Sequence, residues 1–363
     1  MNLAPPPFLK NIASTVRCGR RLAPCHSRFF RSPCPVHDTH LESMADTAHQ
    51  PLPVTFPSED GICAADLYLP LRAGAPREAG PERYPNEPPE EGGTLPPPVV
   101  LMAHGIGAER SFGLARFAER FVTRGIAALV FDYRHFGRST GEPRYLVSPA
   151  RQLTDYRAAL AFVRSDHRVD AHRIALWGTS FSGGHVLAIA AEGPEGVRAV
   201  VSQIPFVSGL ASTLVYPLRY QLPATLLGAI DALRGLMGLA PLTVAVVRKR
   251  GLALLASPDS HDGYLSLVPE GSDWPGRVPA RVFLEVLRYH PSRRAPRIPV
   301  PTLVIGASND AICPMGATRR VVRRVPDARL EEYPIGHFDA YHGEWFEKVV
   351  TREAEFLEEC LDP

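Results

Sequence analysis

Short apolar runs alternate with amphipathic segments from residue 98 onward, and this alternation restricts the possible folds more than any other feature. The runs are rich in Val, Ile and Ala, and the segments between them have helical spacing. Strands that alternate with helices form a mostly parallel sheet covered on both faces. The expected strands are 99–103, 126–131, 174–177, 197–204, 300–306 and 329–333, and the expected helices are 111–124, 148–165, 185–191, 315–324 and 345–361. The sequence therefore predicts an α/β fold with a mostly parallel, doubly wound sheet.

The alternation stops once, between two parts of the expected sheet. Residues 207–296 have helical spacing, several prolines and no clear strand, so we expect a helical lid inserted into the core. We assign the α/β core to residues 51–206 and 297–363, beginning with a β-hairpin around 58–61. Residues 71–97 are rich in Gly, Pro and Glu, which is typical of a flexible surface insertion.

The N-terminal segment 1–50 differs from the rest in composition, and we expect it to be disordered. Its first 37 residues contain no Asp or Glu but six Lys or Arg side chains. This composition resembles a mitochondrial or plastid transit segment. The alternatives are a plain disordered tail, or a translation start at Met44. We expect a cytoplasmic protein, or a mitochondrial one if the segment is a transit peptide.

Charge and cysteine content argue against several classes of partner. A formal net charge of +2 over 363 residues indicates no nucleic-acid partner. The six cysteines include no CxxC pair, and their spacing with nearby histidines matches no zinc site, so we expect neither metal nor cofactor. The most apolar region, 222–247, is interrupted by charged residues and proline, which argues against an integral membrane span. The oligomeric state stays open.

Residues 173–184 place a serine at a tight turn between an expected strand and an expected helix. Ser180 lies among small residues, as in a nucleophile elbow. Gly178 and Gly183 would support this turn, because glycine tolerates strained backbone angles. Ser182 replaces the usual glycine of the motif and is a rival nucleophile. We favour Ser180, because Ser182 is expected to lie already in the first helical turn.

Two further residues complete a possible catalytic set. A serine hydroxyl needs a base to remove its proton, and the base needs an orienting carboxylate. Asp310 and His337 each follow an expected strand, and the carboxyl ends of parallel strands meet at one edge of a sheet. Taken singly, such residues are more often helix caps or solvated side chains, but together they predict a triad with Ser180. Asp132 is a rival acid, since it also ends a strand.

An oxyanion intermediate would need two backbone N–H donors. Phe181, directly after the nucleophile, supplies one in an elbow. The second is expected in the loop after the strand 99–103, where we choose Ile106. His104 and Gly105 would support this loop, because a glycine allows the backbone to turn its amides inward.

Four segments together resemble, in this order, motifs of the α/β-hydrolase superfamily, over about residues 52–363. They are His104-Gly105, the run from Asp132 to Ser139, the run from Gly178 to Gly184, and Asp310 with Gly336-His337. The order Ser, Asp, His is that of the superfamily. The sequence around the serine and the histidine is similar to that of fungal polyketide-pathway hydrolases and acyltransferases, and also to that of dienelactone-hydrolase-like and Xaa-Pro-peptidase-like proteins. The resemblance implies that Asp132, Gly137 and Ser139 support a loop.

These patterns favour a serine hydrolase that cleaves a carboxylic ester or thioester through an acyl-enzyme on Ser180. The alternatives are an acyltransferase using the same acyl-enzyme, a peptidase of the Xaa-Pro type, and a non-catalytic binding protein with this fold. The expected partner is a small acyl substrate.

The apolar composition of the expected lid suggests that this substrate is apolar. Ten large apolar side chains would either line a pocket or, more commonly, pack the lid onto the core: Leu214, Tyr216, Leu218, Tyr220, Leu226, Leu227, Ile230, Leu233, Leu236 and Met237. The basic run 248–250 would contact a membrane or a carrier-bound acyl chain, or form a solvated helix end.

Overall fold

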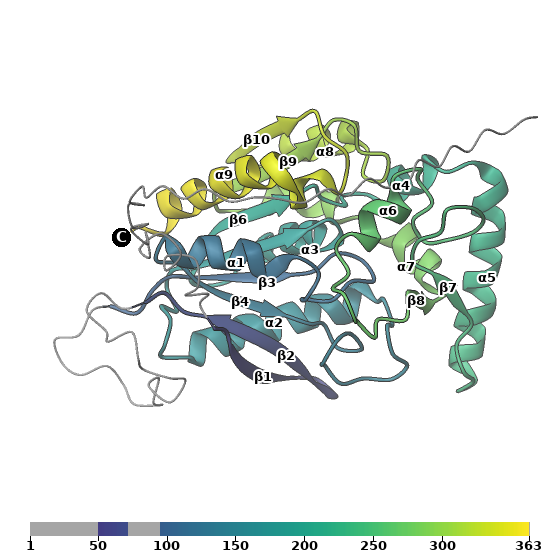
Figure 1. Ribbon diagram of the computed structural model, residues 1–363, viewed down its shortest axis with the longest axis horizontal. Helices are drawn as coiled ribbons and strands as arrows, with labels where there is room; N and C mark the ends of the chain where they lie inside the picture. The colour runs from purple at the N-terminus through teal and green to yellow at the C-terminus, as the bar shows by residue number, and fades with distance from the viewer. Residues whose placement is uncertain (1–49, 72–94, 363) are drawn as a thin grey trace, which may run out of the picture. The chain divides into compact units, whose positions relative to one another are not determined.

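The computed structural model describes residues 50–71 and 95–362, which belong to one compact unit. The expectations for residues 1–50 and 71–97 therefore fall almost wholly outside the described residues. An eight-stranded sheet has the order β1-β2-β4-β3-β5-β6-β9-β10 (Figure 1). The six strands β4-β3-β5-β6-β9-β10 are parallel to one another, and the antiparallel hairpin of β1 and β2 extends the sheet by pairing β2 antiparallel with β4. The expected mostly parallel sheet is confirmed.

The parallel strands lie where the apolar runs predict them, within two residues at each end. Four of them, at 99–103, 127–131, 174–179 and 302–307, are buried along their whole length, as continuous apolar runs require. The strands of the sheet are β1 (Leu52–Ser58), β2 (Gly61–Tyr68), β3 (Val99–Ala103), β4 (Ala127–Phe131), β5 (Ile174–Thr179), β6 (Val197–Gln203), β9 (Thr302–Ala307) and β10 (Ala328–Tyr333).

Helices cover both faces of the sheet. On one face, α1 (Leu114–Thr123) and α9 (Gly343–Leu361) pack aromatic and aliphatic side chains against the strands. On the other face lie α2 (Pro149–Ser165), α3 (Phe181–Ala190) and α8 (Met315–Val322). Helix α1 begins three residues later than the sequence suggested, because Gly113 has a left-handed backbone (φ 76°) that helical residues do not adopt.

The segment between β6 and β9, here called the inserted segment (207–296), gathers at one end of the sheet (Figure 1). Its helices are α4 (Gly209–Leu214), α5 (Leu218–Leu236), α6 (Ser260–Leu265) and α7 (Val282–Arg288), followed by the 3-10 helix η2 (Pro291–Arg297). The expectation of no strand is wrong, because β7 (Thr243–Ala245) and β8 (Arg277–Pro279) pair antiparallel. Strands of three residues are too short for alternation to reveal them.

Two other expectations for the inserted segment are also wrong. The basic run 248–250 lies in an exposed loop after β7, not at a helix end. Of the ten large apolar residues, Tyr216 and Tyr220 line a cavity and Leu227 packs against the core. The other seven neither line the cavity nor pack on the core but are solvent-exposed: Leu214, Leu218, Leu226, Ile230, Leu233, Leu236 and Met237. No helix in the described ranges is long and apolar enough to span a membrane.

Helix α5 is held to the rest of the inserted segment along one side only. The buried carboxylate of Asp231 accepts hydrogen bonds from the backbone N–H of Leu242 (2.7 Å), and from the N–H and Nε of Arg281 (2.9 and 2.7 Å). Gly228 faces α7 so closely that an added Cβ would lie 3.1 Å from the carbonyl oxygen of Ala280. These contacts fix which side of α5 faces inward.

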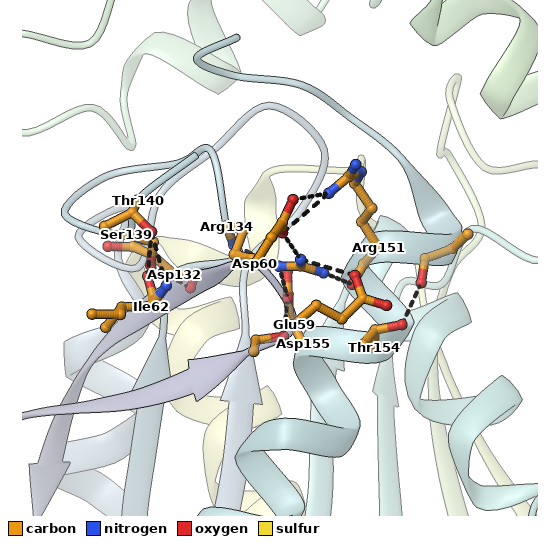
Figure 2. Close-up of polar contacts among 12 residues, drawn as sticks. Glu59, Asp60, Ile62, Asp132, Arg134, Ser139, Thr140, Arg151, Thr154 and Asp155 are labelled. Carbon is orange, nitrogen blue, oxygen red and sulfur yellow. Dashed lines mark hydrogen bonds and ion pairs between the residues drawn. The ribbon is translucent and has the colours of Figure 1, made fainter. Parts of the chain in front are cut away.

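The loop after β4 anchors the β1–β2 hairpin through a buried arginine (Figure 2). The guanidinium of Arg134, only 1% exposed, bonds Asp155 of α2 (2.5 Å) and the hairpin residues Glu59 (2.9 Å) and Asp60 (2.5 Å). The Ser139 hydroxyl accepts the N–H of Ala64 (2.8 Å) and donates to the carbonyl oxygen of its own loop. A buried charge requires such pairing, so these contacts set the register of the hairpin on the sheet.

A second buried polar contact makes the stability of the fold depend on pH. Glu353 of α9 is fully buried and accepts a hydrogen bond from the Trp177 indole (3.1 Å), while its other carboxylate oxygen has no partner among the described residues. Burial raises the pKa of Glu353 to about 8, from an ordinary value of 4.5. Between these two values the unfolded chain loses a proton that the folded chain keeps. Rising pH therefore destabilises the fold across this window.

We expect Glu353→Gln to remove this pH dependence. At pH 5, just above the pKa of 4.5 in the unfolded chain, both folded proteins are neutral at this position, and their free energies of unfolding should be similar. At pH 9 the variant should be more stable by ~1 kcal/mol or more, since each unit of pKa shift corresponds to about 1.4 kcal/mol. Urea unfolding at both pH values measures this difference. A variant that loses as much stability as the wild type between pH 5 and 9 would contradict the prediction.

Candidate active site

Ser180 lies at the turn that joins β5 to α3. Its backbone angles, φ 53° and ψ −113°, are strained for a residue with a side chain. The turn is held by two backbone hydrogen bonds, from the N–H of Ser180 to Gln203 (2.9 Å) and from the N–H of Phe206 to Ser180 (2.8 Å). An added Cβ at Gly178 would lie 2.2 Å from the carbonyl oxygen of Ser182. This close approach explains why small residues surround the serine.

The structure brings Ser180, His337 and Asp310 into one hydrogen-bonded chain. The Nδ1 of His337 lies 2.6 Å from Asp310 Oδ2, and its Nε2 lies 3.0 Å from Ser180 Oγ. A carboxylate only accepts, so Nδ1 carries the proton and Nε2 is free to accept from the serine hydroxyl. The other oxygen of Asp310 accepts the backbone N–H groups of Ile312 (2.6 Å) and Cys313 (2.8 Å). The carboxylate is therefore fixed in place by its own loop.

The two rival residues lie elsewhere and have other partners. The Ser182 hydroxyl is completely buried within α3, and it bonds the Tyr133 hydroxyl (2.7 Å) and the His104 carbonyl oxygen. Asp132 accepts the backbone N–H groups of Arg110 (2.7 Å) and Arg138 (3.2 Å) and pairs with the Arg110 guanidinium. Both residues thus stabilise loops next to Ser180.

The loop after β3 lies directly against the serine. An added Cβ at Gly105 would come within 3.3 Å of Ser180 Cβ, so only glycine fits there without displacement. The Gly105 carbonyl oxygen accepts from Nδ1 of His104 (2.9 Å) and from the N–H of Ala108 (3.3 Å). Because a peptide bond is trans, the N–H of Ile106 points to the opposite side from that carbonyl. Phe181 is the first residue of α3, where N–H groups have no partner within the helix.

His104 is held neutral beneath this loop. Its ring is 1% exposed and packs edge-on against Tyr133, with ring centroids 4.9 Å apart. Burial lowers the pKa of His104, which disfavours the charged imidazolium. Its protonated Nδ1 bonds the loop carbonyl, so its side chain supports the loop from below.

Two residues of the inserted segment also hold this loop, and sequence analysis missed both. The Tyr264 hydroxyl of α6 donates to the Ile106 carbonyl oxygen (2.9 Å), and the Trp274 indole donates to that of Gly107 (2.9 Å). Their rings stack with centroids 5.3 Å apart. The sequence showed only that the inserted segment contains aromatic side chains with a hydrogen-bond donor; it did not indicate their partners. Their partners are more than 150 residues away.

Two cavities meet at Ser180. The larger, about 90 Å³, is bounded by Ile106 and Phe181 on the sheet side and by Tyr216, Tyr220 and Ala224 of the inserted segment. The smaller, about 30 Å³, lies on the side of His337. Among the described residues that line the two cavities there is no Asp, Glu, Lys or Arg. The space next to Ser180 is therefore suited to an uncharged, largely apolar group.

One cluster near the serine has the composition of a metal site. Ligand atoms of Asp310, Cys313 and His337 lie within 4.8 Å of one another. However, Nδ1 of His337 carries the hydrogen that bonds Asp310, so it offers no lone pair to a metal while this bond is kept. Burial, and next the Asp310 charge, raise the pKa of the Cys313 thiol, which disfavours the thiolate that metals bind. The hydrogen-bonded chain thus competes with metal binding in this cluster.

Comparison with solved structures places the fold among α/β hydrolases. GrgF, an α/β hydrolase of Penicillium sp. sh18, superposes with a TM-score of 0.70 at 21% identity, over 86% of this chain and 99% of that one. DcsB, solved with a substrate analogue, gives a TM-score of 0.71 at 20% identity, with the same coverage. At these identities the likeness concerns the fold alone.

Sequence comparison gives nearer relatives. The quorum-quenching protein AidA of Acinetobacter baumannii is 38% identical over 321 residues, which are 88% of this chain and 98% of AidA. A thiohydrolase of Aspergillus aculeatus is 26% identical over 73% of this chain and 86% of its own. The family model described as serine aminopeptidase, S33, matches residues 95–348. This match covers most of the chain, and the chain belongs to the serine aminopeptidase S33 family of α/β hydrolases.

Proposed function

We propose that this enzyme cleaves a carboxylic ester or thioester of an apolar acyl group through an acyl-enzyme on Ser180. The observation that carries the proposal is the position of His337, between the Ser180 hydroxyl and the Asp310 carboxylate. Relatives named thiohydrolase and polyketide transferase support acyl chemistry of this kind.

In the proposed reaction, His337 Nε2 takes the proton of Ser180 as Oγ attacks the acyl carbon. The N–H groups of Ile106 and Phe181 would stabilise the oxyanion, where one such donor is typically worth about 3–4 kcal/mol. The protonated His337 then gives its proton to the leaving alcohol or thiol as the acyl bond breaks. A water molecule, deprotonated by the same nitrogen, releases the acid and restores Ser180.

We assign the acyl group to the larger cavity, which the inserted segment would cover as a lid. Ala224 of α5 lines this cavity and is almost fully buried, so a larger side chain there would fill part of it. Ala161 lies on the exposed side of α2, away from both cavities, and offers a matched control.

We expect Ala224→Phe to shift the preference toward short acyl chains. With p-nitrophenyl esters and acyl thioesters of graded length, kcat/KM for the longest accepted chain should fall at least about tenfold relative to acetate. One extra or missing methylene is worth about 10–200-fold in an apolar pocket. Ala161→Phe should leave the profile unchanged. If Ala224→Phe leaves it unchanged too, the acyl chain does not occupy this cavity.

Acyl transfer is the second candidate, because a second cavity lies on the His337 side of the serine. An alcohol or thiol held there would attack the acyl-enzyme in place of water. Product analysis with and without candidate acceptors separates transfer from hydrolysis. Peptide cleavage with recognition of a free N-terminus is less favoured, since the described lining residues offer no carboxylate to pair with an ammonium group.

A further inference from the structure

The outer side of helix α5 carries a continuous apolar stripe that nothing in the described chain covers. Leu222, Leu226 and Leu233 are 65, 63 and 57% exposed, and Leu218, Ile230 and Met237 extend the same line. These six residues recur every three or four positions, so they share one face of the helix. We call them the α5 stripe.

The stripe is far more apolar than an ordinary protein surface. Between Arg219 and Arg234 the only charged residue of α5 is Asp231, which is buried and paired with Arg281. Further exposed leucines lie on α4, at the end of α5 and just after it: Leu210, Leu214, Leu236 and Leu239. Soluble monomers rarely expose contiguous apolar patches above a few hundred Å². A patch of this kind marks an interaction surface.

We propose that the α5 stripe pairs with the α5 stripe of a second copy of this chain, antiparallel about a two-fold axis. A two-fold interface requires a surface that is complementary to itself when reversed. The two ends of the stripe meet this condition. In an antiparallel pair, Leu218 would lie opposite Met237, Leu222 opposite Leu233, and Leu226 opposite Ala229.

Helix size and charge also fit such a pair. Half the outer surface of a 19-residue helix is about 500 Å², given a rise of ~1.5 Å per residue and a diameter of ~10–12 Å. Two copies would bury about 1,000 Å² through α5 alone, which is about the minimum size of a specific interface. The exposed Arg219 residues of the two copies would lie at opposite ends of the pair, so like charges do not meet.

The small, exposed side chain of Ala229, next to the middle of the stripe, would allow the two helices to approach closely. On its inner side, α5 carries Tyr220, Gln221 and Ala224 along the larger cavity. A second copy would therefore sit directly behind one wall of that cavity. This pairing would cover the surface that the inserted segment otherwise leaves bare.

Sedimentation velocity of the full chain tests the proposal. Protein concentrations from 1 to about 100 µM would bracket dissociation constants in the micromolar range. The wild type is expected to form a dimer. The triple variant Leu222→Glu/Leu226→Glu/Leu233→Glu should dissociate at least about 100-fold more readily, since buried like charges oppose pairing. Ile62→Glu, at a 48% exposed position on β2, is the matched control and should stay dimeric. Thermal melting and p-nitrophenyl ester turnover check that each variant is folded.

Cross-linking gives a second measurement that does not depend on the triple variant. Ala229→Cys treated with a short bismaleimide should give a cross-link between two copies at position 229, identified by mass spectrometry. Ile62→Cys should give none, and the wild-type chain shows the background from its own cysteines.

Three results would overturn the proposal. They are a wild-type monomer at 100 µM, a dimer that the triple variant does not weaken, and the absence of a cross-link at position 229. A monomer that instead sediments with vesicles of phosphatidylcholine and phosphatidylglycerol would assign the stripe to a membrane surface.

Discussion

Replacing Ser180 with alanine is expected to lower kcat for an activated ester by at least about 10⁴-fold, because the acyl-enzyme can no longer form. Folding should survive, since alanine accepts the same backbone position and loses only the hydroxyl that faces His337. A fluorophosphonate probe, which labels activated serines, should mark the wild type and leave the variant unlabelled. Burst kinetics with a p-nitrophenyl ester measure the loss of the acyl-enzyme directly.

Ser182→Ala is the matched control, two positions along the same turn. Its hydroxyl bonds Tyr133 and the His104 carbonyl oxygen, so its removal should reduce stability but keep the labelling. Labelling that persists in Ser180→Ala and disappears in Ser182→Ala would move the nucleophile to the helix. If both variants are still labelled, neither serine of this turn is the nucleophile.

His337→Ala is expected to lower kcat by at least about 10³-fold, because no other base within the described site can take the serine proton. Residues of such a set act as a unit, so the double variant Ser180→Ala/His337→Ala should be no slower than Ser180→Ala alone. Steady-state kinetics on the same ester give all three values. KM should change far less than kcat, since His337 acts mainly on the reacting groups.

His342→Ala is the control for the histidine. His342 lies five positions further on and bonds Ser266 (2.8 Å) instead of the serine of the turn. Its replacement should change kcat no more than a few-fold. An activity that survives His337→Ala but falls with His342→Ala would exchange their roles and contradict the proposed mechanism.

The strands of the sheet and the positions of the site residues could be predicted from local sequence patterns. Continuous apolar runs such as 99–103 and 174–177 become buried strands whatever surrounds them, because burying them is the main favourable term in folding. The positions of Asp310 and His337 just after such strands made their meeting with Ser180 predictable, since parallel strands bring their carboxyl ends to one edge. The small residues around Ser180 reflect a steric limit that also acts within a few residues.

The structure of the inserted segment was predicted far less well from the sequence. Its periodicity predicted helices, but one helix can turn the same leucines toward a cavity, the core or solvent. The orientation of α5 depends on Asp231 pairing with Arg281 and on the close approach of Gly228 to Ala280, fifty residues away in the sequence. For this reason the expected pocket or core leucines are exposed instead. The contacts from Tyr264 and Trp274 to the loop after β3 were equally invisible.

By itself, the sequence determined the parallel sheet, its order of strands and helices along the chain, and the three residues that approach one another at its edge. These features follow from burial and sterics over short stretches of chain. Only the tertiary structure decided which face of α5 meets water, which side chains shape the cavities at Ser180, and which distant residues hold the loop of Ile106. Those outcomes depend on contacts between segments that have no local pattern in common, so they exist only once the chain has folded.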